Sequence, residues 1–132
     1  MGVRMENEKL VKHWIDSAEI DRKAMKHLFG KKDFHWSLFM GHLVIEKLLK
    51  ALYIKENNEQ PPFIHNLSRI VQKTKIEISE GKLDILDTIT TFNIRARYDD
   101  YKQLFYKKCT PEYTAVWIKN IEEMVIWLKE KL

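Results

Sequence analysis

Cysteine, glycine and proline are scarce in this chain of 132 residues, and each scarcity excludes a class of protein. The one cysteine, Cys109, excludes an internal disulfide framework and a zinc site made of several cysteines, and it indicates a reducing compartment. Four glycines leave no glycine-rich loop of the kind that surrounds a phosphate group. Three prolines and few other breaks leave long uninterrupted segments, which is typical of helices.

Long apolar runs are also absent, because none approaches the roughly 20 residues that a membrane-spanning helix needs. The first eight residues carry charges of both signs and no apolar core of a secretory signal, so we expect a cytoplasmic protein. A hydrophobic fraction of 45% is enough to build the core of one domain over residues 1–132. The net charge of +4 permits contact with phosphates without requiring it.

Apolar residues recur at helical spacing in five segments, and no segment alternates with a period of two. Thr110 is expected to cap the last helix, with Pro111 at its first position, where the missing N–H has no cost. The sequence therefore predicts an all-α bundle of four to five helices. The expected helices cover about 8–29, about 33–55, a short segment around 67–71, about 83–97, and 111 to the end.

The expected helix over 33–55 is apolar on most sides, which places it at the centre of a bundle or under a partner chain. His42, Glu46 and Lys50 nevertheless form one polar row on it at successive steps of four, with Lys47 further round. Two interpretations remain open. The row is either the solvent edge of the helix, or it faces a groove that holds a phosphate or the charges of a partner. A metal at His42 and Glu46 lacks an identifiable third ligand.

Further polar residues stand where apolar ones or a plain loop would be expected. Asp21 interrupts the apolar stripe of the first helix, which includes Trp14, and His65 stands where the short third helix begins. Arg97 follows Asn93 by one helical turn and has the planar fork that suits a phosphate or a carboxylate. Its alternative role is a structural ion pair with Asp21 or with one of two aspartates that follow it, Asp99 and Asp100.

Basic and aromatic residues alternate from Tyr98 to Lys108, a pattern that could suit RNA. No helix-turn-helix or RNA-recognition motif accompanies them, so the pattern alone assigns no function.

Four motifs follow one another along the chain. They are Trp14-x3-Ala18-x2-Asp21, the block Phe39-x2-His42 to Ala51, Pro61-Pro62-x2-His65-x-Leu67, and Asn93-x2-Ala96-Arg97-Tyr98. In this order they resemble the HEPN domain family over nearly the whole chain. The resemblance implies an up-and-down antiparallel helical bundle that commonly forms a dimer. It also implies a family in which many small members are encoded beside a minimal nucleotidyltransferase, with which they can form a toxin–antitoxin pair.

Ribonuclease members of the family cut RNA without a metal through an Arg-x4–6-His motif, and this chain departs from that pattern. No histidine stands at the allowed positions after Arg95 or Arg97, and none occurs anywhere after His65. Arg22 and His27 fit the spacing, but they lie on the first helix and would point about 140° apart. A ribonuclease of the usual family type is therefore not expected.

The sequence predicts a non-catalytic homodimer of HEPN type that binds a nucleotide, another polyanion or a nucleotidyltransferase partner. We expect no cofactor, no metal and no membrane. The alternative is a metal-independent ribonuclease toxin with a rearranged site, which would use Arg97 with Tyr98, Tyr101 or His65. A third possibility is an antitoxin or scaffold whose ligand is a protein. The predicted ligand-binding residues are Asp21, Glu46, Lys47, Lys50, His65, Asn93, Arg97 and Tyr98.

Overall fold

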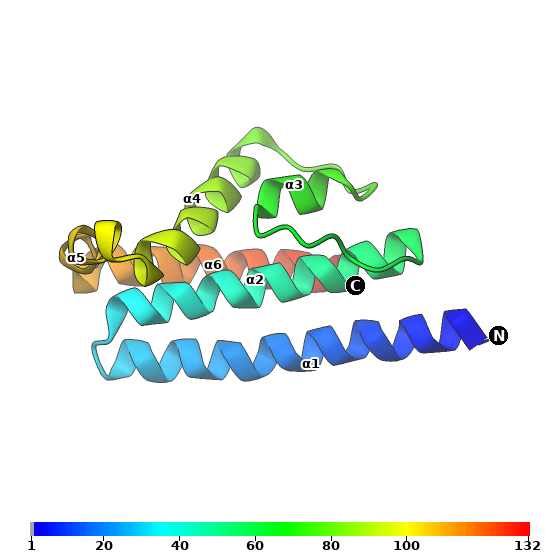
Figure 1. Ribbon diagram of the computed structural model, residues 1–132, viewed down its shortest axis with the longest axis horizontal. Helices are drawn as coiled ribbons and strands as arrows, with labels where there is room; N and C mark the ends of the chain where they lie inside the picture. Colours follow the sequence, from blue (N-terminus) through cyan, green and yellow to red (C-terminus); the bar gives the residue numbers. More distant parts are fainter. Residues whose placement is uncertain (1) are drawn as a thin grey trace.

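The computed structural model describes residues 2–132, with the side chains of 6–98 and 100–132. Within this part the chain is helical and contains no strand. Figure 1 shows the arrangement, in which the long helices lie side by side and the shorter ones gather over one face. The helices are α1 (Gly2–Gly30), α2 (Phe34–Asn57), α3 (Leu67–Gln72), α4 (Glu80–Arg97), α5 (Asp99–Lys108) and α6 (Pro111–Lys131).

The long helices form an up-and-down bundle (Figure 1). α2 returns antiparallel to α1 after a tight turn, α4 crosses back obliquely, and α6 runs beside α2. Arg22 on α1 binds Glu122 on α6, with its Nε 2.8 Å from Oε2, and so joins the first helix to the last. The predicted all-α architecture is confirmed.

α2 is the centre of the molecule, because it contacts every other helix in the described chain. Its apolar residues on several sides are fully buried, among them Leu38, Ile45, Leu49 and Leu52. The prediction of a central helix over 33–55 is thus correct. The helices that cover it belong to the same chain, so its apolar surface gives no support to a dimer.

Side-chain caps explain where several helices begin. The hydroxyl of Thr110 accepts from the Tyr113 N–H and Pro111 follows at the first helical position, as predicted. Ser79 and Asn66 cap α4 and α3 in the same way. The described residues form six helices instead of four to five, because the basic and aromatic segment from Asp99 folds as the separate helix α5.

Gly41 of α2 lies directly against a side chain of α6 and a side chain of α1. A Cβ atom built on Gly41 would collide with Ile121 of α6 and would lie 3.2 Å from the Met25 sulfur of α1. Glycine at this position therefore permits the close packing of the three long helices. No helix of the described chain is long and apolar enough to cross a membrane.

Candidate functional site

His42 lies at the middle of α2 and is completely buried. Its Nε2 is 3.2 Å from the backbone carbonyl of His65, and a carbonyl only accepts, so Nε2 carries the proton. The other ring nitrogen, Nδ1, has no hydrogen-bond partner in the described chain. Burial lowers the pKa of His42, which therefore stays neutral near pH 7.

Glu46, one turn further along α2, joins His65 to Lys50. Its Oε1 is 2.6 Å from His65 Nδ1, and its Oε2 is 3.4 Å from Lys50 Nζ. The carboxylate side chain is only 7% exposed, whereas the His65 side chain is 66% exposed. A buried carboxylate thus holds an exposed imidazole in one orientation. The Nε2 atom of that imidazole has no partner in the described part of the chain.

Lys50 is held from two sides. Its ammonium group pairs with Glu46 and lies 5.4 Å from the centre of the Trp14 ring on α1. Its side chain is 12% exposed, so its charge is largely matched within the protein.

Arg97 ends α4 and is exposed to solvent. Its guanidinium group lies 5.8 Å from the centre of the Phe39 ring and 5.4 Å from that of Tyr98. Its Nε donates to the backbone carbonyl of the buried Asn93 at 3.1 Å. Among the described side chains no carboxylate pairs with it, and the side chain of Asp99 lies outside the described residues.

These residues follow one side of α2. Phe39, His42, Glu46 and Lys50 are spaced by three, four and four residues, which places them along one face. Arg97, which lies over Phe39, is thus on the same side of the molecule as Lys50. Phe39 and Lys50 are separated along the axis of α2 by about 16 Å. Arg97 is also close enough to lower the pKa of His42. We call this set the polar row: His42, Glu46, Lys50, His65 and Arg97.

The three residues of the polar row that belong to α2, His42, Glu46 and Lys50, do not form the solvent edge of this helix. That interpretation is wrong, because His42, Glu46 and most of Lys50 are buried under the segment that carries His65. The loop before α3 covers α2 at this point. The helical pattern of α2 gives no sign of this loop, because His65 lies 19 residues beyond Glu46 in the sequence.

Asp21 and Lys47 form a different contact. Lys47 Nζ lies 2.5 Å from Asp21 Oδ2 and donates to Ser17 Oγ at 2.8 Å, which joins α1 to α2. This ion pair explains the polar interruption in the stripe of α1, and the alternative in which Asp21 pairs with Arg97 is wrong. The structure therefore brings Glu46, Lys50 and His65 into contact and places Arg97 further along the same face, over Phe39. Asp21 and Lys47 lie at the neighbouring helix contact.

Two aromatic residues at the polar row contact cations, which the sequence does not reveal. Trp14 lies under Lys50, and Phe39 lies under Arg97. Their helical spacing is that of ordinary core residues, so nothing local to either segment indicates these contacts.

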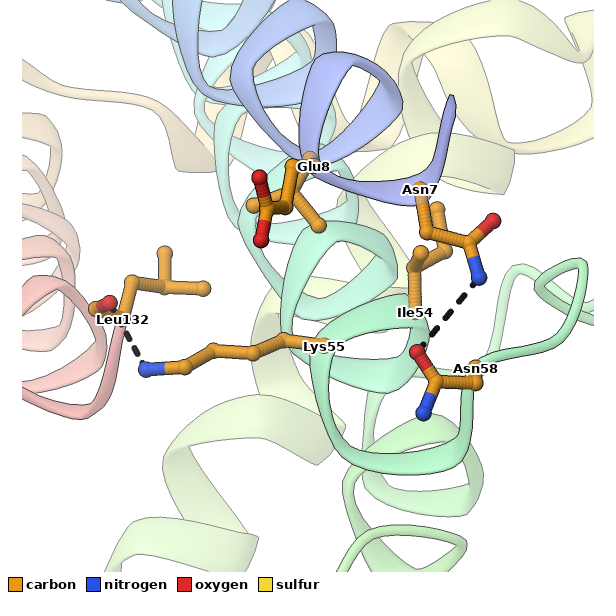
Figure 2. A pocket seen from close by; sticks show the side chains of 7 residues that line it. Asn7, Glu8, Ile54, Lys55, Asn58 and Leu132 are labelled. Atoms are coloured by element: carbon orange, nitrogen blue, oxygen red, sulfur yellow. Dashed lines mark hydrogen bonds between the residues drawn. The ribbon is translucent and has the colours of Figure 1, made fainter. Parts of the chain in front are cut away.

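Three cavities of the described chain open away from the polar row. One of about 500 Å³ opens between the start of α1, the end of α2 and Leu132. Figure 2 shows Lys55 reaching across to Leu132 and Asn7 facing Asn58 at its rim. No group of three or more His, Cys, Asp or Glu residues in the described part of the chain is arranged to hold a metal ion.

Comparison with known proteins agrees with this architecture. The model of the HEPN domain matches residues 11–132. The crystal structure of TT1696 from Thermus thermophilus has a TM-score of 0.81 at 16% identity, and the match covers 92% of this chain and 98% of that chain. At this identity the likeness concerns the fold alone. The comparison with curated proteins gave no match.

Proposed function

This chain belongs to the HEPN domain family, and we propose that its polar row binds the phosphate groups of a nucleotide or another polyanion without catalysing a reaction. The observation that carries the proposal is the exposed Arg97. Its guanidinium group rests on Phe39 and Tyr98 and has no carboxylate partner among the described side chains. An arginine held in this way keeps its forked N–H groups available for a phosphate.

The remainder of the polar row supports Arg97 in this role. The negative charge of Glu46 is balanced by Lys50, so the carboxylate does not repel an anion bound at the Arg97 end of the row. His65 presents an exposed imidazole on the same face. Its Nδ1 donates to the Glu46 carboxylate, so Nε2 donates a hydrogen bond to a phosphate oxygen when the ring carries its second proton. We infer that Arg97 and His65 contact the ligand, while Glu46, Lys50 and Asn93 hold them in place.

Tyr98 adds an exposed ring beside Arg97, on which a base of the ligand can stack. Asp21 and Lys47 have a supporting role in this proposal, because their ion pair fixes α1 against α2.

Titration calorimetry with ATP, other nucleotides and short RNA tests the proposal. Arg97→Ala is expected to weaken binding by about 1.5–3 kcal/mol, the range for a hydrogen bond to a charged group. Arg95→Ala, two residues earlier on α4, is the matched control and should bind as the wild type does. Absence of heat at millimolar nucleotide, or equal loss in both variants, would contradict the proposal.

A second candidate function rests on one distance. His65 Nδ1 and Glu46 Oε1 are 2.6 Å apart, and a carboxylate that orients an imidazole is the arrangement of a general acid or base. With Arg97 on the same face, His65 could cleave RNA without a metal. Incubation with labelled total RNA tests this alternative: cleavage that is lost in both His65→Ala and Arg97→Ala would favour the ribonuclease over the binding protein.

We further propose that the chain acts as a homodimer and pairs with a minimal nucleotidyltransferase, as one half of a toxin–antitoxin pair. The support is membership of a family in which dimers are common. Light scattering tests the dimer, and co-purification with the product of a neighbouring nucleotidyltransferase gene tests the partner. Co-purification without any nucleotide binding would instead favour an antitoxin or scaffold.

A further inference from the structure

A second candidate binding site lies where α5 packs against the first turn of α2. A cavity of about 560 Å³ opens there, a volume within the range of small-molecule sites. It shares no residue with the polar row. We call it the aromatic pocket, and it is lined by His35, Trp36, Lys102, Gln103, Tyr106 and Lys107.

Three rings form the aromatic pocket. The ring of His35 lies 5.0 Å from that of Trp36 and 5.3 Å from that of Tyr106, centre to centre. His35 and Trp36 are held by α2, whereas Tyr106 is carried by α5 and is 63% exposed. A mostly exposed tyrosine at the mouth of a cavity offers a flat apolar surface to a ligand.

Two lysines flank these rings. Lys102 Nζ lies 5.1 Å from the centre of the Trp36 ring, and Lys107 is exposed further along α5. Neither has an ion-pair partner among the described side chains. The pKa of His35 is lowered by burial and by Lys102, against an opposing effect of Asp33, so this imidazole adds no charge near pH 7. The pocket therefore combines stacking surfaces with two unmatched positive charges.

We infer that the aromatic pocket binds a base of a single-stranded nucleic acid, stacked on Tyr106 and Trp36, with the flanking phosphates beside Lys102 and Lys107. Aromatic rings interleaved with cations are the general means of holding single strands with little sequence preference. Gln103 supplies an amide at the wall that can pair with the edge of a base. This site goes beyond the proposed function and stands whether or not the polar row binds a nucleotide.

Fluorescence anisotropy with labelled oligomers of about ten nucleotides tests the inference. The oligomers are oligo(U), oligo(dT) and an abasic deoxyribose phosphate of the same length. Tyr106→Ala is expected to weaken binding of both base-containing oligomers about 5- to 150-fold, the effect of losing one stacked base, and to leave the abasic oligomer unchanged. Phe63→Ala, which removes a fully exposed ring on the loop before α3 outside the pocket, is the control and should have no effect.

Charge is tested separately from stacking. Lys107→Gln is expected to weaken all three oligomers and to reduce the salt dependence of binding, while Lys119→Gln on α6 should not. Three results would overturn the inference. The first is equal affinity of Tyr106→Ala and the wild type for the base-containing oligomers, and the second is a loss of affinity in Tyr106→Ala that is as large for the abasic oligomer as for these. The third is no binding of any oligomer by the folded wild type at about 100 µM. None of them affects nucleotide binding through Arg97, which the calorimetry measures independently.

Discussion

The exposed imidazole of His65 is held by the buried carboxylate of Glu46, with 2.6 Å between Nδ1 and Oε1. The two residues are 19 positions apart, and their contact closes the loop before α3 onto the middle of α2. The same carboxylate also pairs with Lys50. Glu46 is therefore the residue on which the geometry of the polar row depends most.

Glu46→Gln is expected to lower the free energy of unfolding by about 2 kcal/mol or more. The substitution keeps the shape of the side chain but leaves the mostly buried Lys50 ammonium without its negative partner, and losing one member of a buried pair is costly. Urea unfolding followed by circular dichroism measures the change. Glu123→Gln, an exposed site on α6, is the control, and a Glu46→Gln effect no larger than that of the control would contradict this view of the row.

Stability is expected to fall as the pH drops from about 7 to about 5, in part through His42. Burial lowers the pKa of folded His42 below the ordinary value of 6.5, despite the opposing effects of its hydrogen bond to the His65 carbonyl and of the Glu46 carboxylate. The unfolded chain therefore takes up the proton first, and stability present above about pH 6.5 is lost as the pH falls toward the folded pKa.

His42→Gln tests this assignment, because the amide can still donate to the His65 carbonyl but does not titrate. The slope of unfolding free energy against pH should decrease by up to about 1.4 kcal/mol per pH unit. Part of the slope should remain, since the pKa of buried His35 is also lowered. An unchanged slope would show that His42 is not held neutral in the folded protein.

Gly41→Ala is expected to destabilise the protein by about 1–2 kcal/mol, although alanine favours helices over glycine by about 1 kcal/mol. The reason is the collision of the new methyl group with Ile121. Gly30→Ala at the end of α1 has open space around it and should be neutral or stabilising. Calorimetric unfolding temperatures of the two variants compare them directly. A stabilised Gly41→Ala protein would mean that the three long helices have room to separate.

Cys109 is expected to react slowly with a disulfide reagent at about pH 8 while the protein is folded. The thiol is buried, and burial raises its pKa from 9.0 to about 12, so almost no thiolate is present. Reaction in guanidinium chloride gives the rate for the exposed thiol and serves as the reference. A folded-state rate close to that reference would contradict the burial of Cys109 between α5 and α6.

The sequence predicts the fold more completely than the site, because the fold depends on local signals and the site depends on contacts between distant segments. The central position of α2 follows from its apolar residues on most sides, and the start of α6 follows from Thr110 and Pro111, all of which are local signals. The contact of Glu46 with His65 depends on how a loop folds over α2. No periodicity carries that information, so the sequence alone also permits the row to be a solvent edge.

The same limit explains the partners of two charged residues. The sequence makes Asp21 a candidate ligand group, and the structure pairs it with Lys47 across the α1–α2 contact. From the sequence, Arg97 can bind either a carboxylate of the chain or a phosphate ligand. Within the described chain its guanidinium group lies against the rings of Phe39 and Tyr98. Opposite charges far apart in sequence have many possible partners, and only the packing of the helices selects among them.

The most direct test of phosphate binding at the polar row is an NMR titration of the protein with ATP, following the imidazole signals of all five histidines. We expect saturable shifts of the His65 signals that disappear in Arg97→Ala, while exposed His13 and His27 on α1 stay unchanged. Shifts confined to His13 or His27, or His65 shifts that persist without the Arg97 guanidinium, would contradict phosphate binding there.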